Sequence, residues 1–136
     1  MGATLKDASV DLAGLDAGGQ WLKAVLDAQS DALVSAGTLQ APLVITCGCE
    51  GHGPTDPHTL GHALDVRTDD LTPAQIRAVY VALVEALGRQ FTVLWEVAPG
   101  ATVPPELADL AYVGPVTAPH LHLQVRKGHT FDPAQP

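Results

Sequence analysis

Apolar residues recur at helix-like spacing near the N-terminus. They are Leu22, Val25, Leu26, Leu33 and Val34. This spacing predicts an amphipathic helix over residues 19–35, which Gly37 ends. A second helix is predicted over residues 73–87, because Thr72 and Gln75 form a capping-box pattern around a proline at the first helical position.

Short apolar or alternating runs rich in β-branched residues predict strands between and after these helices. They cover residues 43–47, 63–67, 91–97 and 120–126. Residues 48–57 and 98–119 are rich in Gly and Pro and are expected to form loops, with one helical turn near residues 106–110. The tail after Gly128 is expected to fray.

This order of elements predicts a single α+β domain over residues 1–136. We expect a small, mainly antiparallel sheet of about four strands, with the helices packed on one face and a cleft on the other. The length of 136 residues and the 46% of hydrophobic residues are sufficient for a core without disulfides.

Charge and hydropathy exclude several classes of partner. The net charge is −8 and only seven residues are Lys or Arg, which argues against nucleic-acid binding. No apolar run has transmembrane length, and no signal peptide is visible, so we expect cytoplasmic synthesis and no membrane span. The oligomeric state stays open.

The histidines are the strongest chemical signal, because five of the six fall in two clusters. They are His52, His58 and His62 in and after the first loop, and His120 and His122 on the last strand. On that strand the two histidines share one side, while the intervening Leu and Val residues share the core side. The histidine side therefore faces a cleft, solvent or a metal.

The first cluster supplies a carboxylate as well. His58 is in the loop, and Asp65 lies on the following strand on the same side as Ala63 and Arg67. Two histidines and one aspartate suit zinc, and three protein ligands leave a fourth position for water. On the residues alone, either His120 or His122 can be the second histidine ligand.

The spacing His58-x-x-Gly61-x-Ala63-x-Asp65, followed by Pro119-His120-x-His122, resembles the superfamily of lysostaphin-type endopeptidases, D-Ala-D-Ala metallopeptidases and hedgehog domains. The resemblance covers roughly residues 43–125. It implies the fold of that superfamily, a Zn²⁺ cofactor and hydrolysis of peptidoglycan peptides.

The resemblance also implies roles for individual residues. His58, Asp65 and His122 would be the zinc ligands. His120 would be the general base, or a cation that stabilises the oxyanion. The acidic residue that the carboxypeptidases carry three positions before the last ligand is missing, and Glu96 on the neighbouring strand is the candidate to replace it.

A second departure concerns the substrate. D-Ala-D-Ala carboxypeptidases carry a Ser-Gly-x-Arg stretch whose arginine holds the substrate carboxylate, whereas this chain has Cys47-Gly48-Cys49-Glu50. We therefore expect an endopeptidase rather than a carboxypeptidase, similar to the endolysins and tail-associated enzymes that phages or prophages encode and that act in the virion or at lysis. The two cysteines are expected to be reduced, buried thiols at a strand end; a C-x-C pair can also bind metal, but the sequence has no second cysteine pair.

Two alternatives remain on the same scaffold. One is a non-catalytic zinc-binding domain, as in hedgehog proteins, and the other is a phage structural or interaction domain with a vestigial motif. Neither His52, His62 nor His129 is expected to touch the site, and Trp95 is expected to lie in the core.

Overall fold

The computed structural model describes residues 2–50 and 53–135. Within them the elements follow in the order β1 (Thr4–Leu5), α1 (Ala17–Ser35), β2 (Val44–Cys47), β3 (Ala63–Arg67), α2 (Pro73–Leu87), β4 (Phe91–Val97), the 3₁₀ turn η1 (Pro105–Leu107), β5 (Ala111–Val113) and β6 (His120–Val125). Both predicted helices and all four predicted strands are therefore present, with ends that differ by at most two residues from those expected.

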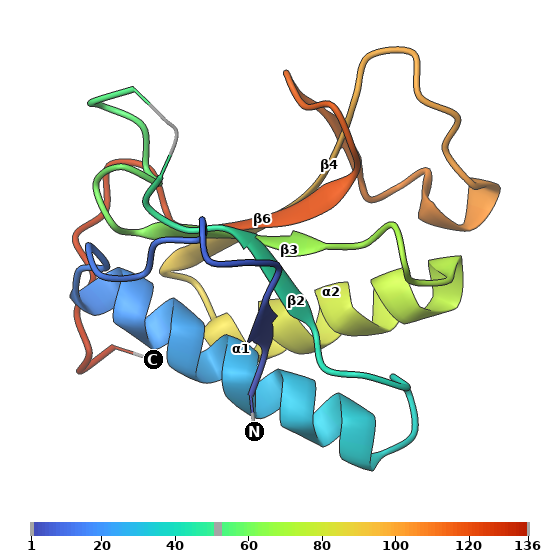
Figure 1. The fold of residues 1–136 in the computed structure, drawn as a ribbon, viewed down its shortest axis with the longest axis horizontal. Coiled ribbons are helices and arrows are strands. Elements are labelled where there is room, and N and C mark those ends of the chain that lie inside the picture. The colour runs from blue at the N-terminus through green and yellow to red at the C-terminus, as the bar shows by residue number, and fades with distance from the viewer. Residues whose placement is uncertain (1, 51–52, 136) are drawn as a thin grey trace.

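The strands form one mixed sheet in the order β1-β2-β3-β6-β4-β5. The inner pairs β2–β3, β3–β6 and β6–β4 are antiparallel, whereas the edge pairs β1–β2 and β4–β5 are parallel. Both helices lie on the same side of this sheet, and the loops that precede β3 and follow β4 rise on the other side (Figure 1).

The prediction of a mainly antiparallel sheet of about four strands was wrong, since the described residues contain six strands in a mixed sheet. The two additional strands have two and three residues, which is too short to show an alternating pattern. Each is parallel to its neighbour because a long crossover separates the two in sequence. The crossover contains α1 between β1 and β2, and η1 between β4 and β5.

Local signals explain where the helices begin. The Thr72 hydroxyl accepts a hydrogen bond from the Gln75 amide, and the Gln75 side chain accepts one from the Thr72 amide, which confirms the predicted capping box. Helix α1 begins at Ala17, two residues earlier than predicted, because Asp16 caps it by accepting from the Gly19 amide at 2.8 Å.

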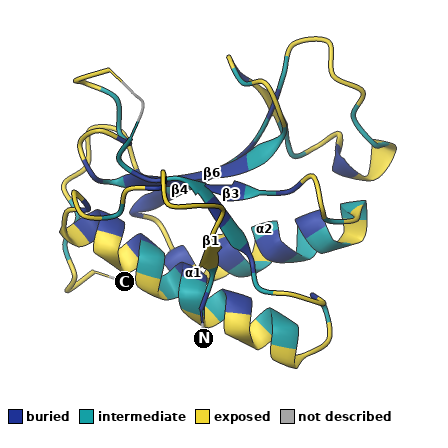
Figure 2. Cartoon of the chain, viewed as in Figure 1, coloured by how far each residue is buried: buried dark blue, intermediate teal, exposed yellow. Residues whose placement is uncertain are grey.

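The hydrophobic core lies between the helices and the sheet. Figure 2 shows the sheet-facing sides of α1 and α2 buried and their outer sides exposed. Leu22 and Leu26 of α1 are fully buried, as are Leu121 and Leu123 of β6. Burial of each such leucine contributes roughly 1.5–3 kcal/mol. The apolar side of each inner strand is thus fixed toward the helices, and the polar side is left for the site.

The C-terminal tail does not fray as the sequence analysis predicted. The Phe131 ring packs at 5.7 Å from the Trp21 ring and at 5.5 Å from the Phe91 ring, measured between centroids. The side chain of Gln90 also donates to the Asp132 carbonyl and accepts from the Asp132 amide, both at 2.8 Å. These contacts hold the tail against the ends of α1 and β4.

Neither helix within residues 2–50 and 53–135 combines the length and the apolar character that crossing a membrane requires.

Gly61 shapes the loop that carries the first histidine. Its φ is +86°, and a Cβ atom there would lie 2.1 Å from the Gly14 carbonyl oxygen. We expect Gly61→Ala to lower the free energy of unfolding by about 2 kcal/mol or more, because both the backbone conformation and the contact resist a side chain. Gly53→Ala is the matched control, since Gly53 has open space around its Cα and an ordinary φ. Equal denaturant midpoints for the two variants would contradict this role.

Candidate metal centre

The three inner strands β3, β6 and β4 bring four polar side chains together. Asp65 of β3 is the direct pairing partner of His122 on β6, and His120 of β6 is the partner of Glu96 on β4. Directly paired residues point to the same face of a sheet. The cleft predicted on the face opposite the helices therefore contains the four residues that the sequence analysis assigned from these strands.

His58 reaches the same place from the preceding loop. Its side chain is almost fully buried, and its Nδ1 lies 2.8 Å from the Gly48 carbonyl oxygen. A carbonyl can only accept, so Nδ1 carries the hydrogen and Nε2 is the nitrogen that faces the site. A histidine held in this way through one ring nitrogen is typical of metal ligands.

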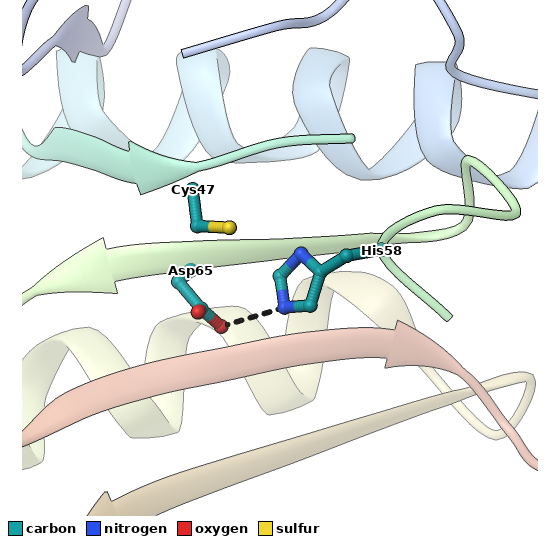
Figure 3. A group of neighbouring side chains, drawn as sticks. All are labelled: Cys47, His58 and Asp65. Carbon is teal, nitrogen blue, oxygen red and sulfur yellow. Dashed lines mark ion pairs between the residues drawn. The ribbon is translucent and has the colours of Figure 1, made fainter. Parts of the chain in front are cut away.

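The Asp65 carboxylate is the centre of the cluster. Its Oδ1 lies 3.2 Å from Nε2 of His58 and 2.9 Å from Nδ1 of His122, and its Oδ2 lies 3.6 Å from Nε2 of His120. Figure 3 shows the His58 ring directed at this carboxylate. All three histidines thus contact one buried anion.

Glu96 and His120 form a second pair beside that centre. Nε2 of His120 lies 3.0 Å from Oε1 of Glu96, and Nδ1 lies 3.1 Å from the Ala118 carbonyl oxygen. Both ring nitrogens therefore face oxygen acceptors, which favours the doubly protonated, cationic ring. Glu96 does not pair with Arg67 or Arg126 within the described residues, where its ion-pair partners are His120 and His122.

The pKa values of the cluster follow from these contacts. Burial alone would raise the pKa of Asp65, but hydrogen bonds from His122 and His58 and the nearby positive charges hold it well below its usual range. Burial would lower the pKa values of His120 and His122, yet hydrogen bonds to Glu96 and Asp65 outweigh it and raise both. In the metal-free cluster these contacts thus favour the ionised form of Asp65 and the protonated forms of His120 and His122.

Two sets of residues in the described part of the chain could hold a metal ion. Within each set, the potential ligand atoms all lie within 4.8 Å of one another. One consists of Cys47, His58 and Asp65, and the other of Asp65, Glu96 and His120. His122 belongs to neither set, although its Nδ1 contacts Asp65 Oδ1. The predicted ligands His58, Asp65 and His122 are thus not one of these two sets, although both histidines contact the same carboxylate oxygen, Oδ1 of Asp65.

The donor chemistry of these residues fits zinc. Imidazole nitrogen, carboxylate oxygen and thiol sulfur are the ligand types that Zn²⁺ prefers. Nε2 of His122 lies 2.7 Å from Oε1 of Gln124, which orients the ring with Nδ1 toward Asp65. Outer partners thus hold both candidate histidine ligands, His58 through Gly48 and His122 through Gln124.

A pocket of about 690 Å³ opens over the cluster. Its walls include Glu96, His120 and the cations Lys6 and Arg67, together with residues 115–119 of the loop before β6. The size is in the range of ordinary ligand sites. The pocket thus lies on the face of the sheet opposite the helices, with the side chains of the cluster in its wall.

The residues that were expected not to touch the site lie outside the cluster where the structure describes them. His62 pairs with Asp16 at 3.3 Å, and His129 lies 2.8 Å from the Gln90 side chain. Trp95 is buried and donates from its indole to Thr68, which confirms its place in the core. His52 lies outside the described residues.

Three features of the site were not predicted: the Gly48 carbonyl, Gln124 and Cys47. Gln124 had a signal in the sequence, since it follows His120 and His122 at the same two-residue spacing on β6. Glu50 occupies the sequence position of the arginine that holds the substrate carboxylate in the carboxypeptidases, but it does not lie at the pocket. It accepts from the Asp11 and Gly48 amides at 2.9 Å.

The raised histidine pKa values predict how stability depends on pH. In the metal-free protein, protonated His120 and His122 contribute stability that is complete below their unfolded value of 6.5 and is lost as the pH rises through their higher folded values. Ionised Asp65, whose pKa is lowered, contributes stability that is complete above its unfolded value of 3.8 and is lost as the pH falls through its lower folded value. We therefore expect Tm to fall above a pH of about 6.5.

Zinc is expected to reverse this slope, because it binds the neutral rings and competes with protons. Thermal denaturation followed by circular dichroism, with and without zinc, measures both slopes. A metal-free Tm that does not decline between about pH 6.5 and pH 8.5 would show that the cluster is not organised around charged histidines.

Comparison of the chain with protein-family models, curated proteins and solved structures found no match.

Proposed function

We propose that this protein is a zinc metallopeptidase that hydrolyses peptidoglycan peptides as an endopeptidase. The observation that carries the proposal is the convergence of His58 and His122 on Oδ1 of Asp65, with the Glu96–His120 pair beside it and an open pocket above. His58, Asp65 and His122 would hold the metal. When bound, zinc supplies a Lewis acid for a peptide carbonyl and a water of lowered pKa.

Glu96 and His120 would handle protons and charge in this reaction. A carboxylate oxygen of Glu96 lies within 4.8 Å of ligand atoms of Asp65 and His120, so Glu96 would accept the proton of the attacking water. His120 keeps both nitrogens protonated between Glu96 and the Ala118 carbonyl, which suits a cation that stabilises the oxyanion rather than a base. The role of Glu96 replaces the acidic residue that is missing before the last strand.

The walls of the pocket support a peptide substrate. Lys6 and Arg67 bring positive charge to an otherwise acidic protein at this place, and peptides of the cell wall carry carboxylates that such groups attract. The preference for an endopeptidase rests on the absence of an arginine at position 50, where related carboxypeptidases carry their carboxylate-binding arginine; Glu50 itself does not line the pocket.

Incubation of the zinc-loaded protein with purified muropeptides tests this proposal. Mass spectrometry of the products should show internal cleavage of the peptides, and His122→Ala should be inactive. Release of only a C-terminal residue would correct the assignment to a carboxypeptidase. Intact muropeptides with stoichiometric zinc in the wild-type protein would instead support a non-catalytic zinc domain.

A further inference from the structure

Cys47 lies on one side of His58 and Asp65, and the Glu96–His120 pair lies on the other. Cys47 is the last residue of β2 and the direct partner of Asp65 across the β2–β3 pair. Its Sγ lies within 4.8 Å of ligand atoms of both His58 and Asp65. Figure 3 shows the sulfur directed into the space between these two side chains.

The surroundings of the thiol also connect it to the first histidine. Cys47 Sγ lies 3.7 Å from the Gly48 carbonyl oxygen, the same atom that accepts from Nδ1 of His58. One backbone group therefore orients both side chains. The cysteine is half-buried and its position is set by the sheet register, so it does not depend on a flexible loop.

We propose that Cys47 is a further ligand of the same metal and binds it as a thiolate together with His58, Asp65 and His122. This inference rests on the proposed zinc site. A coordinated thiol is deprotonated by the metal itself, so the negative charge of Asp65 beside it is compensated by the cation between them. Zinc sites with mixed sulfur, nitrogen and oxygen ligands are common.

Four protein ligands would close the position that water needs. Cys47 would then be the ligand that leaves when a substrate enters. Of the three ligands on strands it lies farthest from the Glu96–His120 side of the cluster, because β2 and β4 lie on opposite sides of the central pair β3–β6. Without substrate, the metal would thus have no open position for water. The position would open when the Cys47 thiolate leaves the metal.

Cys49 provides a matched control two residues away. A Cβ atom built at Gly14 would lie 3.2 Å from Cys49 Sγ, which places this thiol against the N-terminal segment. Cys49 contributes no atom to either candidate ligand set within the described residues. Cys49→Ser thus changes the same chemistry in the same segment without changing the proposed ligand.

The test is the near-ultraviolet spectrum of protein loaded with one equivalent of Co²⁺ in place of zinc. Wild type and Cys49→Ser should show the intense thiolate-to-cobalt charge-transfer band, and Cys47→Ser should lack it while still binding cobalt. Cobalt-loaded wild type without the band, or Cys47→Ser with it, would overturn the proposal and leave the metal site intact. Wild type that binds no cobalt and no zinc would overturn the metal site as well.

Discussion

Asp65→Asn is expected to lower the affinity for zinc by more than about 100-fold, the upper end of the loss caused by removing an outer-shell partner. The reason is that the Asp65 carboxylate contacts all three of His58, His120 and His122. An amide has nearly the same shape but lacks the negative charge. Competition with a chromophoric chelator measures the change.

The matched control for this variant is Asp69→Asn. Asp69 also lines the pocket, but its side chain is exposed and its ion-pair partner is Arg67 at 3.8 Å. Its zinc affinity should stay within a few-fold of wild type, since exposed pairs contribute little. If Asp65→Asn, shown by circular dichroism to be folded, binds zinc as tightly as Asp69→Asn, then Asp65 is not a ligand.

Glu96→Gln is expected to lower kcat on muropeptides by about 10²–10⁴-fold, the usual effect of losing a general base. The glutamine oxygen can still accept from His120, so the arrangement of the pair should persist while the proton acceptor is lost. The zinc content should remain unchanged, because Glu96 is not one of the proposed ligands. Kinetics on zinc-loaded protein separate this effect from metal loss.

Glu106→Gln serves as the control for Glu96→Gln. Glu106 is an exposed carboxylate in η1 and is not among the residues lining the pocket. Its kcat should equal that of wild type. A Glu96→Gln protein with wild-type kcat would remove Glu96 from the mechanism and leave His120 as the remaining candidate.

The sequence was sufficient to predict the inner part of the fold because its signals are local. The capping box around Pro73 and the alternation of β6 each depend on residues close in sequence. The edge strands β1 and β5 were missed because their pairing is decided by crossovers between distant segments. The attachment of the tail through Phe131 was missed for the same reason.

In the candidate site, too, the residues with a local sequence signal were predicted, and the one that depends on strand pairing was not. His58, Asp65 and the His120–His122 pair were identified from spacing, and the sheet register brings the three strand residues to one face. Cys47 was expected to be a reduced, buried thiol at a strand end, and metal binding by the single C-x-C pair was not favoured. The approach of Cys47 to His58 depends on how β2 pairs with β3, with an irregularity in register between residues 45 and 47 that no spacing in the sequence predicts.

Elemental analysis of zinc tests the central claim most directly. Wild type and His120→Ala, purified without a chelator and supplied with zinc before dialysis, should each retain about one zinc per chain. His58→Ala, Asp65→Ala and His122→Ala should retain none. A wild-type protein that retains no zinc, or a His122→Ala protein that retains as much as wild type, would contradict the account.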